Sequence, residues 1–148
     1  MVRDARVTQQ AQPGHQADPP ADQTRRAETV LVVEDAAGLR KIVRRVLVDN
    51  GFDVTEAVNG KDALGIITNR ATPFDLVLSD VVMPELSGGR LLRELKQMGY
   101  TGRVMLMSGY AEDNAQLRDA LRAGTTLLEK PFTPEQLVRQ VRAVLDAA

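Results

Sequence analysis

The sequence contains no cysteine and no tryptophan, and only 3% of its 148 residues are aromatic. Without cysteine the chain forms no disulfide and offers no thiolate to a metal, which is typical of a reducing compartment, so a cytoplasmic location is expected. Neither charge is in surplus, with 19 Lys and Arg against 20 Asp and Glu, so the basic excess typical of nucleic-acid binding is missing. No apolar run approaches the ~20 residues of a membrane-spanning helix, and we expect no direct membrane contact.

The first 28 residues differ in composition from the rest of the chain. They consist mainly of Gln, Asp, Pro, Ala and Arg, and a segment with so little to bury does not offset the entropy of ordering it. We therefore predict a disordered tail or interdomain linker at residues 1–28, followed by one domain at residues 29–148. The one histidine, His15, lies in the tail, where we interpret it as a solvated residue and not as a ligand or phosphoacceptor.

From Thr29 onward, short apolar runs alternate with segments of helical periodicity. The apolar runs predict strands at residues 29–33, 52–57, 74–79, 103–108 and 125–129. The segments between and after these strands predict helices with one apolar face each. In the first helix this face contains Leu39, Ile42, Val43, Val46 and Leu47. In the third it contains Leu91, Leu92 and Leu95, and in the last it contains Leu137, Val141, Val144 and Leu145. The expected second and fourth helices cover residues 60–70, where Gly65 is unfavourable, and 112–124. Ser87 and Thr133 are the expected N-caps of the third and last helices, the latter with Pro134 and Gln136 completing a capping box.

Strands that alternate with helices through short loops predict an α/β domain with a parallel sheet. Helices cover both faces of such a sheet, which explains why its strands are continuous apolar runs. Binding sites in open α/β sheets lie beyond the carboxyl ends of the strands, where the strand order changes direction. The residues at these strand ends are therefore the candidates for chemistry.

Polar side chains are found at the carboxyl ends of four of the five predicted strands. The first strand ends in Glu34 and Asp35, and the third ends in Asp80. Such acids repel one another unless a cation lies between them, and a hard divalent ion with oxygen ligands from Asp35 and Asp80, and water held by Glu34, fits best. Ser108 and Lys130, at the ends of the fourth and fifth strands, would then face a second anion. A phosphoryl group on one of the carboxylates fits as that anion, since a metal and a lysine would neutralise it and a hydroxyl would donate a hydrogen bond to it.

Four blocks of the sequence, "VLVVEDAAGLR", "DLVLSDVVMPELSG", "VMLMSGYAED" and "LLEKPF", resemble the signature blocks of a response-regulator receiver domain of two-component signalling. The resemblance extends from Thr29 to Asp146. It implies a flavodoxin-like fold with strand order 2-1-3-4-5, and a signalling domain that is phosphorylated on an Asp, not an enzyme in the ordinary sense. It also implies that the domain assists its own phosphotransfer and dephosphorylation, with a histidine kinase or a histidine phosphotransfer protein as partner; the oligomeric state stays open.

The resemblance also implies roles for single residues. Asp80 matches the phosphoacceptor, Ser108 the switch hydroxyl and Lys130 the phosphate-binding lysine. The ligands of Mg²⁺, with Mn²⁺ as a substitute, match Glu34, Asp35, Asp80 and the backbone carbonyl of Val82. The bond before Pro131 is commonly cis in the family.

Two positions depart from the common pattern of the family. Leu127 stands three residues before the lysine, where many receivers that drive an output domain have Tyr or Phe. Glu34 replaces the commoner Asp. With "LLEKPF" and "MSGYAED", the chain is most similar to the receiver at the C-terminus of a hybrid sensor histidine kinase, and residues 1–28 would then be part of the linker.

Other functions remain as alternatives. A stand-alone single-domain response regulator shares all the features above. A phosphatase of the haloacid dehalogenase type also phosphorylates a strand-end Asp, but its general acid would fall at Val82, which carries no proton. A receiver that serves only for docking would be expected to lack one of the acids or the lysine, and this sequence has all of them. A dinucleotide-binding fold would have a glycine fingerprint after the first strand, but "VEDAAG" contains only Gly38.

Overall fold

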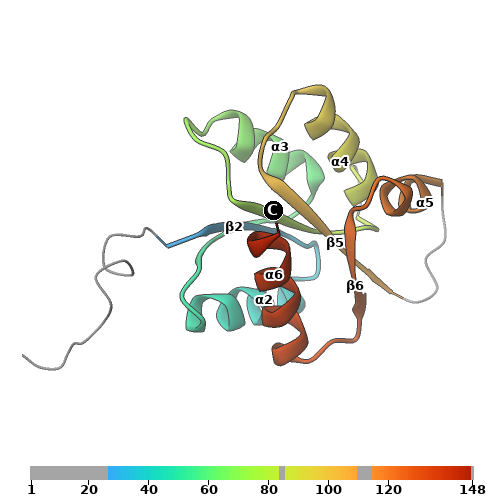
Figure 1. The fold of residues 1–148 in the computed structure, drawn as a ribbon. Coiled ribbons are helices and arrows are strands. Elements are labelled where there is room, and N and C mark those ends of the chain that lie inside the picture. The colour runs from blue at the N-terminus through green and yellow to red at the C-terminus, as the bar shows by residue number, and fades with distance from the viewer. Residues whose placement is uncertain (1–26, 84–85, 110–114, 148) are drawn as a thin grey trace, which may run out of the picture.

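A parallel sheet forms the centre of the molecule (Figure 1). The computed structural model describes residues 27–83, 86–109 and 115–147. The five strands of this sheet are β2 (Thr29–Val33), β3 (Asp53–Ala57), β4 (Leu76–Asp80), β5 (Arg103–Gly109) and β6 (Thr126–Lys130). They lie in the order β3-β2-β4-β5-β6, which is 2-1-3-4-5 when the strands are counted along the chain. The predicted flavodoxin-like α/β fold is confirmed.

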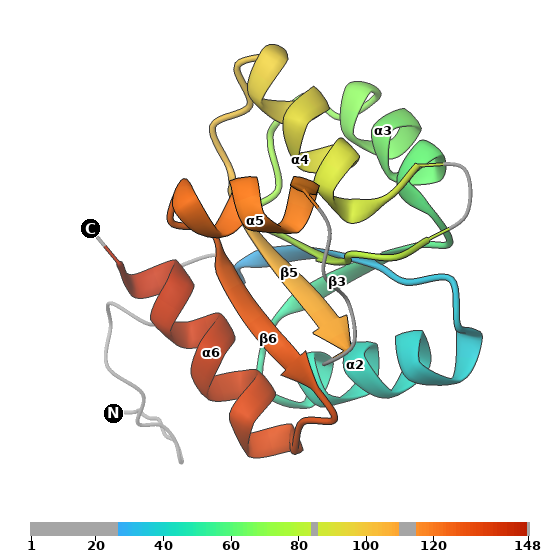
Figure 2. The same cartoon turned by 90° about the vertical axis from the view of Figure 1, so that its right-hand side faces the viewer.

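Helices cover both faces of the sheet (Figures 1 and 2). One face carries α2 (Ala37–Asp49) and α6 (Pro134–Asp146), which contact each other and which we call the α2–α6 layer. The other face carries α3 (Gly60–Thr68), α4 (Gly88–Gln97) and α5 (Ala115–Arg122), which we call the α3–α5 layer. Within the described residues, no helix has the length and apolar character needed to cross a bilayer.

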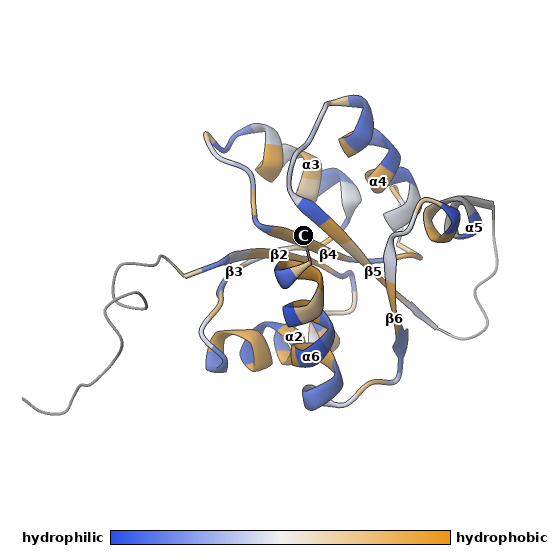
Figure 3. Cartoon of the chain, in the orientation of Figure 1, coloured by the Kyte–Doolittle hydropathy of each residue, from blue (hydrophilic) through white to orange (hydrophobic). Residues whose placement is uncertain are grey.

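The two layers have separate cores because neighbouring residues of a strand point to opposite faces. In β2, Val30 and Val32 pack with the α2–α6 layer, whereas Leu31 and Val33 pack with the α3–α5 layer. All four side chains are fully buried, which explains why the strand reads as an unbroken apolar run. Figure 3 shows the resulting pattern, with apolar residues in the strands and polar residues on the outer faces of the helices.

Side-chain caps fix the starts of several helices. The predicted capping box of α6 is confirmed, with the Thr133 hydroxyl accepting from the Gln136 amide and the Gln136 side chain accepting from the Thr133 amide. The Ser87 hydroxyl caps α4 by accepting from the Arg90 amide at 3.2 Å, also as predicted. The cap of α3 was not predicted: Asn59 Oδ1 accepts from the Asp62 amide at 2.7 Å.

Some element details differ from the sequence-based expectations. Ile42 is 59% exposed and lies outside the buried face of α2, because that face is centred on Val43 and Leu47 and a residue one step away is rotated by about 100°. The third strand begins at Leu76 and not at Phe74, since the Asp75 carboxylate accepts a hydrogen bond from the Thr29 amide and ties this end of β4 to β2. The predicted helix at 112–124 is described as Ala115–Arg122, and residues 112–114 lie outside the described residues.

The segment just before β2 contacts the last helix. The Arg142 guanidinium donates to both oxygens of the Glu28 carboxylate, at 2.8 and 2.9 Å, and also pairs with Asp146. The Glu28 carbonyl accepts from the Asp53 amide at 2.9 Å, which continues the pairing of β2 with β3. Glu28 therefore packs with the domain, although the composition of residues 1–28 placed it in the predicted tail.

Candidate functional site

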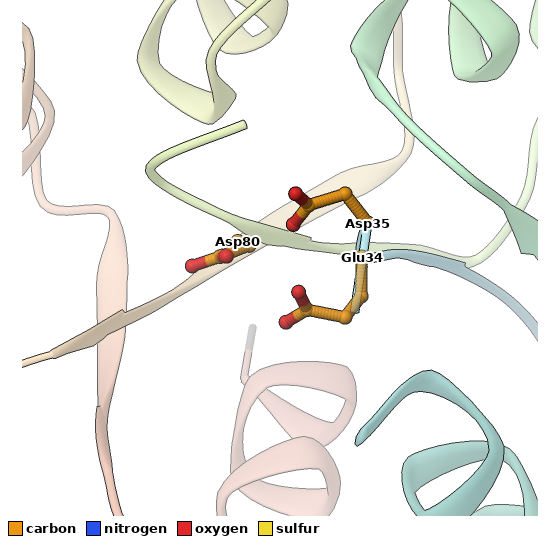
Figure 4. Close-up of side chains that lie close together, drawn as sticks. All are labelled: Glu34, Asp35 and Asp80. Carbon is orange, nitrogen blue, oxygen red and sulfur yellow. The ribbon is translucent and has the colours of Figure 1, made fainter. Parts of the chain in front are cut away.

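The carboxylates of Glu34, Asp35 and Asp80 meet at one edge of the sheet (Figure 4). The register pairs Val33 of β2 with Ser79 of β4, so the residues that follow, Glu34 and Asp80, lie side by side at the carboxyl ends of the two strands. One carboxylate oxygen of each of the three acids lies within 4.8 Å of the others. Sequence reasoning placed these acids together, and the structure brings them together.

Glu34 is a buried carboxylate that is held on both oxygens. Its side chain is 1% exposed, and Oε1 accepts from Lys130 Nζ at 3.1 Å while Oε2 accepts from the Ala36 amide at 3.1 Å. Asp35 is exposed and leaves the chain on the opposite side of the strand from Glu34 (Figure 4). The two neighbouring acids therefore have different surroundings, one inside the domain and one facing solvent.

Lys130 joins two of the acids from the far end of the chain. Its Nζ lies 3.1 Å from Glu34 Oε1 and 3.2 Å from Asp80 Oδ1, and Asp80 is only 5% exposed. Burial alone lowers the pKa of Lys130, but the charge of Asp80 and the hydrogen bond and charge of Glu34 outweigh it, so the pKa lies above its ordinary value. Lys130 is therefore protonated at neutral pH, and the Lys130–Pro131 bond that follows it is cis, as the family resemblance implied.

Ser108 lies at the same edge, near the end of β5, and is buried. Its hydroxyl donates to the Gly109 carbonyl at 3.0 Å. Ser108 points to the same face of the sheet as Leu106, which packs in the α3–α5 layer, whereas Lys130 points to the same face as Leu128, which packs in the α2–α6 layer. Lys130 thus contacts Asp80 from the α2–α6 face, and Ser108 lies at the same end of the sheet on the α3–α5 face.

The loop after Asp80 carries two further features. Val82, two residues beyond β4, has a 53% exposed side chain, and the metal contact expected from its carbonyl stays a prediction. Gly88, the first residue of α4, donates its amide to the Val81 carbonyl at 2.8 Å. A Cβ atom on Gly88 would collide with the Asp80 carbonyl oxygen, so α4 starts directly against the backbone of the candidate phosphoacceptor.

The donor set fits a hard divalent cation. Lys130 supplies one positive charge to a group of three carboxylates, two of them buried, and like charges this close are costly without further compensation. Mg²⁺ prefers carboxylate oxygens, and it usually keeps several waters, which the exposed position of Asp35 allows. The chemistry of the site therefore agrees with the predicted metal.

Comparison with known proteins identifies the family. A sequence profile described as the response regulator receiver domain matches residues 30–142. The chain belongs to this family. Receiver domains are the signalling domains of two-component response regulators, they generally bind Mg²⁺ at an acidic cluster, and they interact with histidine kinases. Among the described residues of this receiver domain, Glu34, Asp35 and Asp80 form an acidic group of this kind.

The receiver domain is similar to a segment of a sensor kinase and to whole single-domain regulators. It is 40% identical over 118 residues to sensor kinase CckA of Brucella abortus, covering 80% of this chain and 12% of the kinase. It is 33% identical over 122 residues to chemotaxis protein CheY of Bacillus subtilis, covering 81% of this chain and 99% of CheY. The structure of chemotaxis protein CheY4 of Vibrio cholerae matches with a TM-score of 0.69 at 28% identity, covering 80% of this chain and 98% of that protein.

Proposed function

We propose that Asp80 of this receiver domain accepts a phosphoryl group from the phosphohistidine of a histidine kinase or a histidine phosphotransfer protein. The observation that carries the proposal is the position of the Asp80 carboxylate, which lies 3.2 Å from the ammonium of Lys130 and beside the acids Glu34 and Asp35. A buried acid with a purely structural role is satisfied by one lysine, and two further acids beside it would only add repulsion. Incubation with a small-molecule phosphodonor should add one hydroxylamine-sensitive phosphoryl group, and its absence under all conditions would contradict the proposal.

The transfer is a substitution at phosphorus. An oxygen of the ionised Asp80 carboxylate forms a bond to phosphorus while the bond between phosphorus and the imidazole nitrogen of the donor breaks, and the departing imidazole takes up a proton. Lys130 is protonated and balances negative charge on the phosphoryl oxygens. Ser108 donates a hydrogen bond to one of these oxygens after its hydroxyl turns from the Gly109 carbonyl.

Mg²⁺ would be held by Asp35 and Asp80 directly and by Glu34 through water, with the Val82 carbonyl as a further ligand. When bound, the metal neutralises charge on the transferring group. Because both oxygens of Glu34 already accept hydrogen bonds, from Lys130 and from the Ala36 amide, this residue is better placed to hold a water than to coordinate the metal itself.

Phosphorylation is expected to require Mg²⁺ or Mn²⁺ and to stop when the metal is chelated. Asp35→Asn should weaken Mg²⁺ binding more than Glu34→Gln, because Asp35 contributes a direct ligand and Glu34 acts through water. Calorimetric titration of both variants with Mg²⁺ measures this order. Wild-type affinity in both variants would show that the acids do not form the metal site.

The similarity to part of CckA supports a hybrid histidine kinase as the origin of this receiver domain, with residues 1–28 as linker. The similarity to a whole CheY protein, at 33% identity against 40% for the kinase, supports a stand-alone regulator as the alternative. The chain spans 12% of the kinase and 99% of CheY, and the sequence that flanks the corresponding reading frame distinguishes the two cases. Slow hydrolysis of the phosphoryl group by the domain itself, and the cytoplasmic location, stay predictions of the same proposal.

Phosphorylation is expected to change the α3–α5 layer only near Ser108. Leu127 is half-buried, pairs with Leu106 across β5 and β6, and packs against a cluster formed by Val81, Leu92, Leu106 and Ala120. A leucine has no ring to move between a buried and an exposed position, so it does not carry the change outward as Tyr or Phe would.

Hydrogen exchange with and without a beryllofluoride phosphate mimic measures this effect. We expect slower exchange in the segment 108–113, of which residues 110–113 lie outside the described residues, and little change from Leu127 to Leu137. Strong protection from Leu127 to Leu137 would show that the switch extends further. Leu127→Tyr is the matched variant, and it should enlarge the response of β6.

A further inference from the structure

Arg40 connects the acidic end of β2 to the neighbouring strand β3. It lies in the first turn of α2, and its side chain is 11% exposed. Its Nη1 donates to the Glu34 carbonyl oxygen at 2.8 Å, and its Nε donates to Glu56 Oε1 at 2.9 Å. One guanidinium thus bonds a main-chain oxygen of the acidic cluster and a carboxylate of another strand.

The second partner, Glu56, anchors the guanidinium. Glu56 lies on β3 opposite Val32 of β2, and its Oε2 lies 3.3 Å from Arg44 Nε, so two arginines share this carboxylate. A largely buried guanidinium needs ionic and hydrogen-bonding partners, and its planar fork can satisfy two acceptors at fixed angles. Glu56 therefore fixes the direction in which Arg40 presents its remaining donor to Glu34.

The peptide between Glu34 and Asp35 is held by this contact. A peptide group is planar, so fixing the Glu34 carbonyl oxygen also fixes the amide of Asp35 and the direction in which the Asp35 Cα leaves. On the preceding side, the Glu34 amide donates to the Ala57 carbonyl at 3.2 Å. The Asp35 side chain is exposed, so its position relative to Asp80 depends on this stretch of backbone.

We propose that Arg40 is a positioning residue for the metal site, one that sets the Asp35 carboxylate opposite Asp80 by holding the Glu34 carbonyl. The proposal rests on the proposed function. It differs from an ordinary role in stability, because Arg40 contacts the main chain that carries the ligand, whereas Arg44, within the described residues, pairs with the other oxygen of Glu56. Within the described residues, the side chain of Arg40 contacts Glu34 and Glu56 and makes no contact with Asp80.

Arg40→Met tests the proposal, since it keeps most of the aliphatic stem and removes both donors. We expect Mg²⁺ affinity to fall about tenfold or more, within the range typical for residues that orient metal ligands, while the maximal phosphorylation rate at saturating Mg²⁺ changes less. In the metal-free protein, the amide resonances of Asp35 and Ala36 should shift. This last readout does not depend on phosphorylation.

Arg44→Met is the matched control, because it removes the other arginine from Glu56 and leaves the Glu34 carbonyl bond in place. Its Mg²⁺ affinity should change by less than about threefold, since an ion pair whose arginine is half exposed contributes little. If Arg40→Met does not fold, Arg40→Lys and Glu56→Gln replace it. Arg40→Lys keeps one of the two hydrogen bonds of the guanidinium, and Glu56→Gln keeps an uncharged acceptor. Both variants should therefore bind Mg²⁺ with affinities between those of the wild type and Arg40→Met.

The outcomes separate the two proposals. A wild-type domain that neither binds Mg²⁺ nor accepts a phosphoryl group contradicts the proposed function. A wild-type domain that does both, beside a folded Arg40→Met variant with the same Mg²⁺ affinity and unmoved Asp35 and Ala36 resonances, overturns the role of Arg40 alone. Equal losses in Arg40→Met and Arg44→Met would show a general effect of the arginine pair on the fold and would also overturn it.

Discussion

Asp80→Asn is expected to abolish phosphorylation of this receiver domain while the fold persists. The substitution removes the nucleophilic carboxylate oxygen and keeps the size of the side chain at a position that is 5% exposed. The fold should tolerate it, since one of three clustered negative charges disappears and Lys130 keeps its contact with Glu34. Intact-mass measurement after incubation with a small-molecule phosphodonor and Mg²⁺ gives the result, and thermal unfolding checks the fold.

Asp53→Asn is the control for this experiment. Asp53 is exposed at the amino end of β3, whereas the acidic cluster lies at the carboxyl ends of the strands. Removing the Asp53 carboxylate should therefore leave phosphorylation unchanged. A folded Asp80→Asn variant that still gains one phosphoryl group at the wild-type rate would move the phosphoacceptor to another residue. Asp35 would then be the next candidate, because it is the exposed acid of the cluster.

Gly88→Ala is expected to destabilise the domain and to slow phosphorylation. The added methyl group would overlap the backbone oxygen of Asp80 and its neighbouring atoms, and backbone cannot move aside as the end of a flexible side chain can. Relief of such an overlap in a packed region costs about 1–3 kcal/mol in the free energy of unfolding. The same movement displaces the end of β4, which is why we expect the rate of phosphorylation to fall together with stability.

Gly65→Ala is the matched substitution in the interior of α3. A Cβ atom there meets nothing within 4 Å. Because glycine costs a helix about 0.5–1 kcal/mol relative to alanine, this variant should be more stable than the wild type and phosphorylated at the same rate. Denaturant unfolding of both variants gives the comparison. Stability losses of the same size at Gly65 and Gly88 would mean that the contact with Asp80 has no special effect.

Much of the fold follows from local patterns in the sequence. The run from Val30 to Val33 is buried on both sides in the structure, and its length and β-branched residues predict a central parallel strand. The site was also predictable in outline, because the ends of parallel strands meet at one edge and Glu34, Asp80 and Lys130 occupy such ends. Their contacts of 3.1 and 3.2 Å agree with that reasoning.

Contacts that depend on how a helix sits on the sheet were not predictable. Arg40 resembles any other cation of an amphipathic helix until α2 is placed beside β3, and only then does its guanidinium reach Glu34 and Glu56. The exposure of Ile42 depends on the same placement, since periodicity alone gives a wider apolar face than the sheet covers. The cap at Asn59, by contrast, had a local signal in the Asp three residues later, whose carboxylate accepts from the Val58 amide.

The separation of the two cores has a consequence for how a charge on Asp80 is felt. Lys130 follows Leu128 on the face packed by the α2–α6 core, and Ser108 follows Leu106 on the face packed by the cluster that contains Val81 and Leu92. A phosphoryl group on Asp80 that is held by both Lys130 and Ser108 would therefore join the two faces of the sheet through one covalent group. The two layers share only the strands, so a response in one layer can be measured separately from a response in the other.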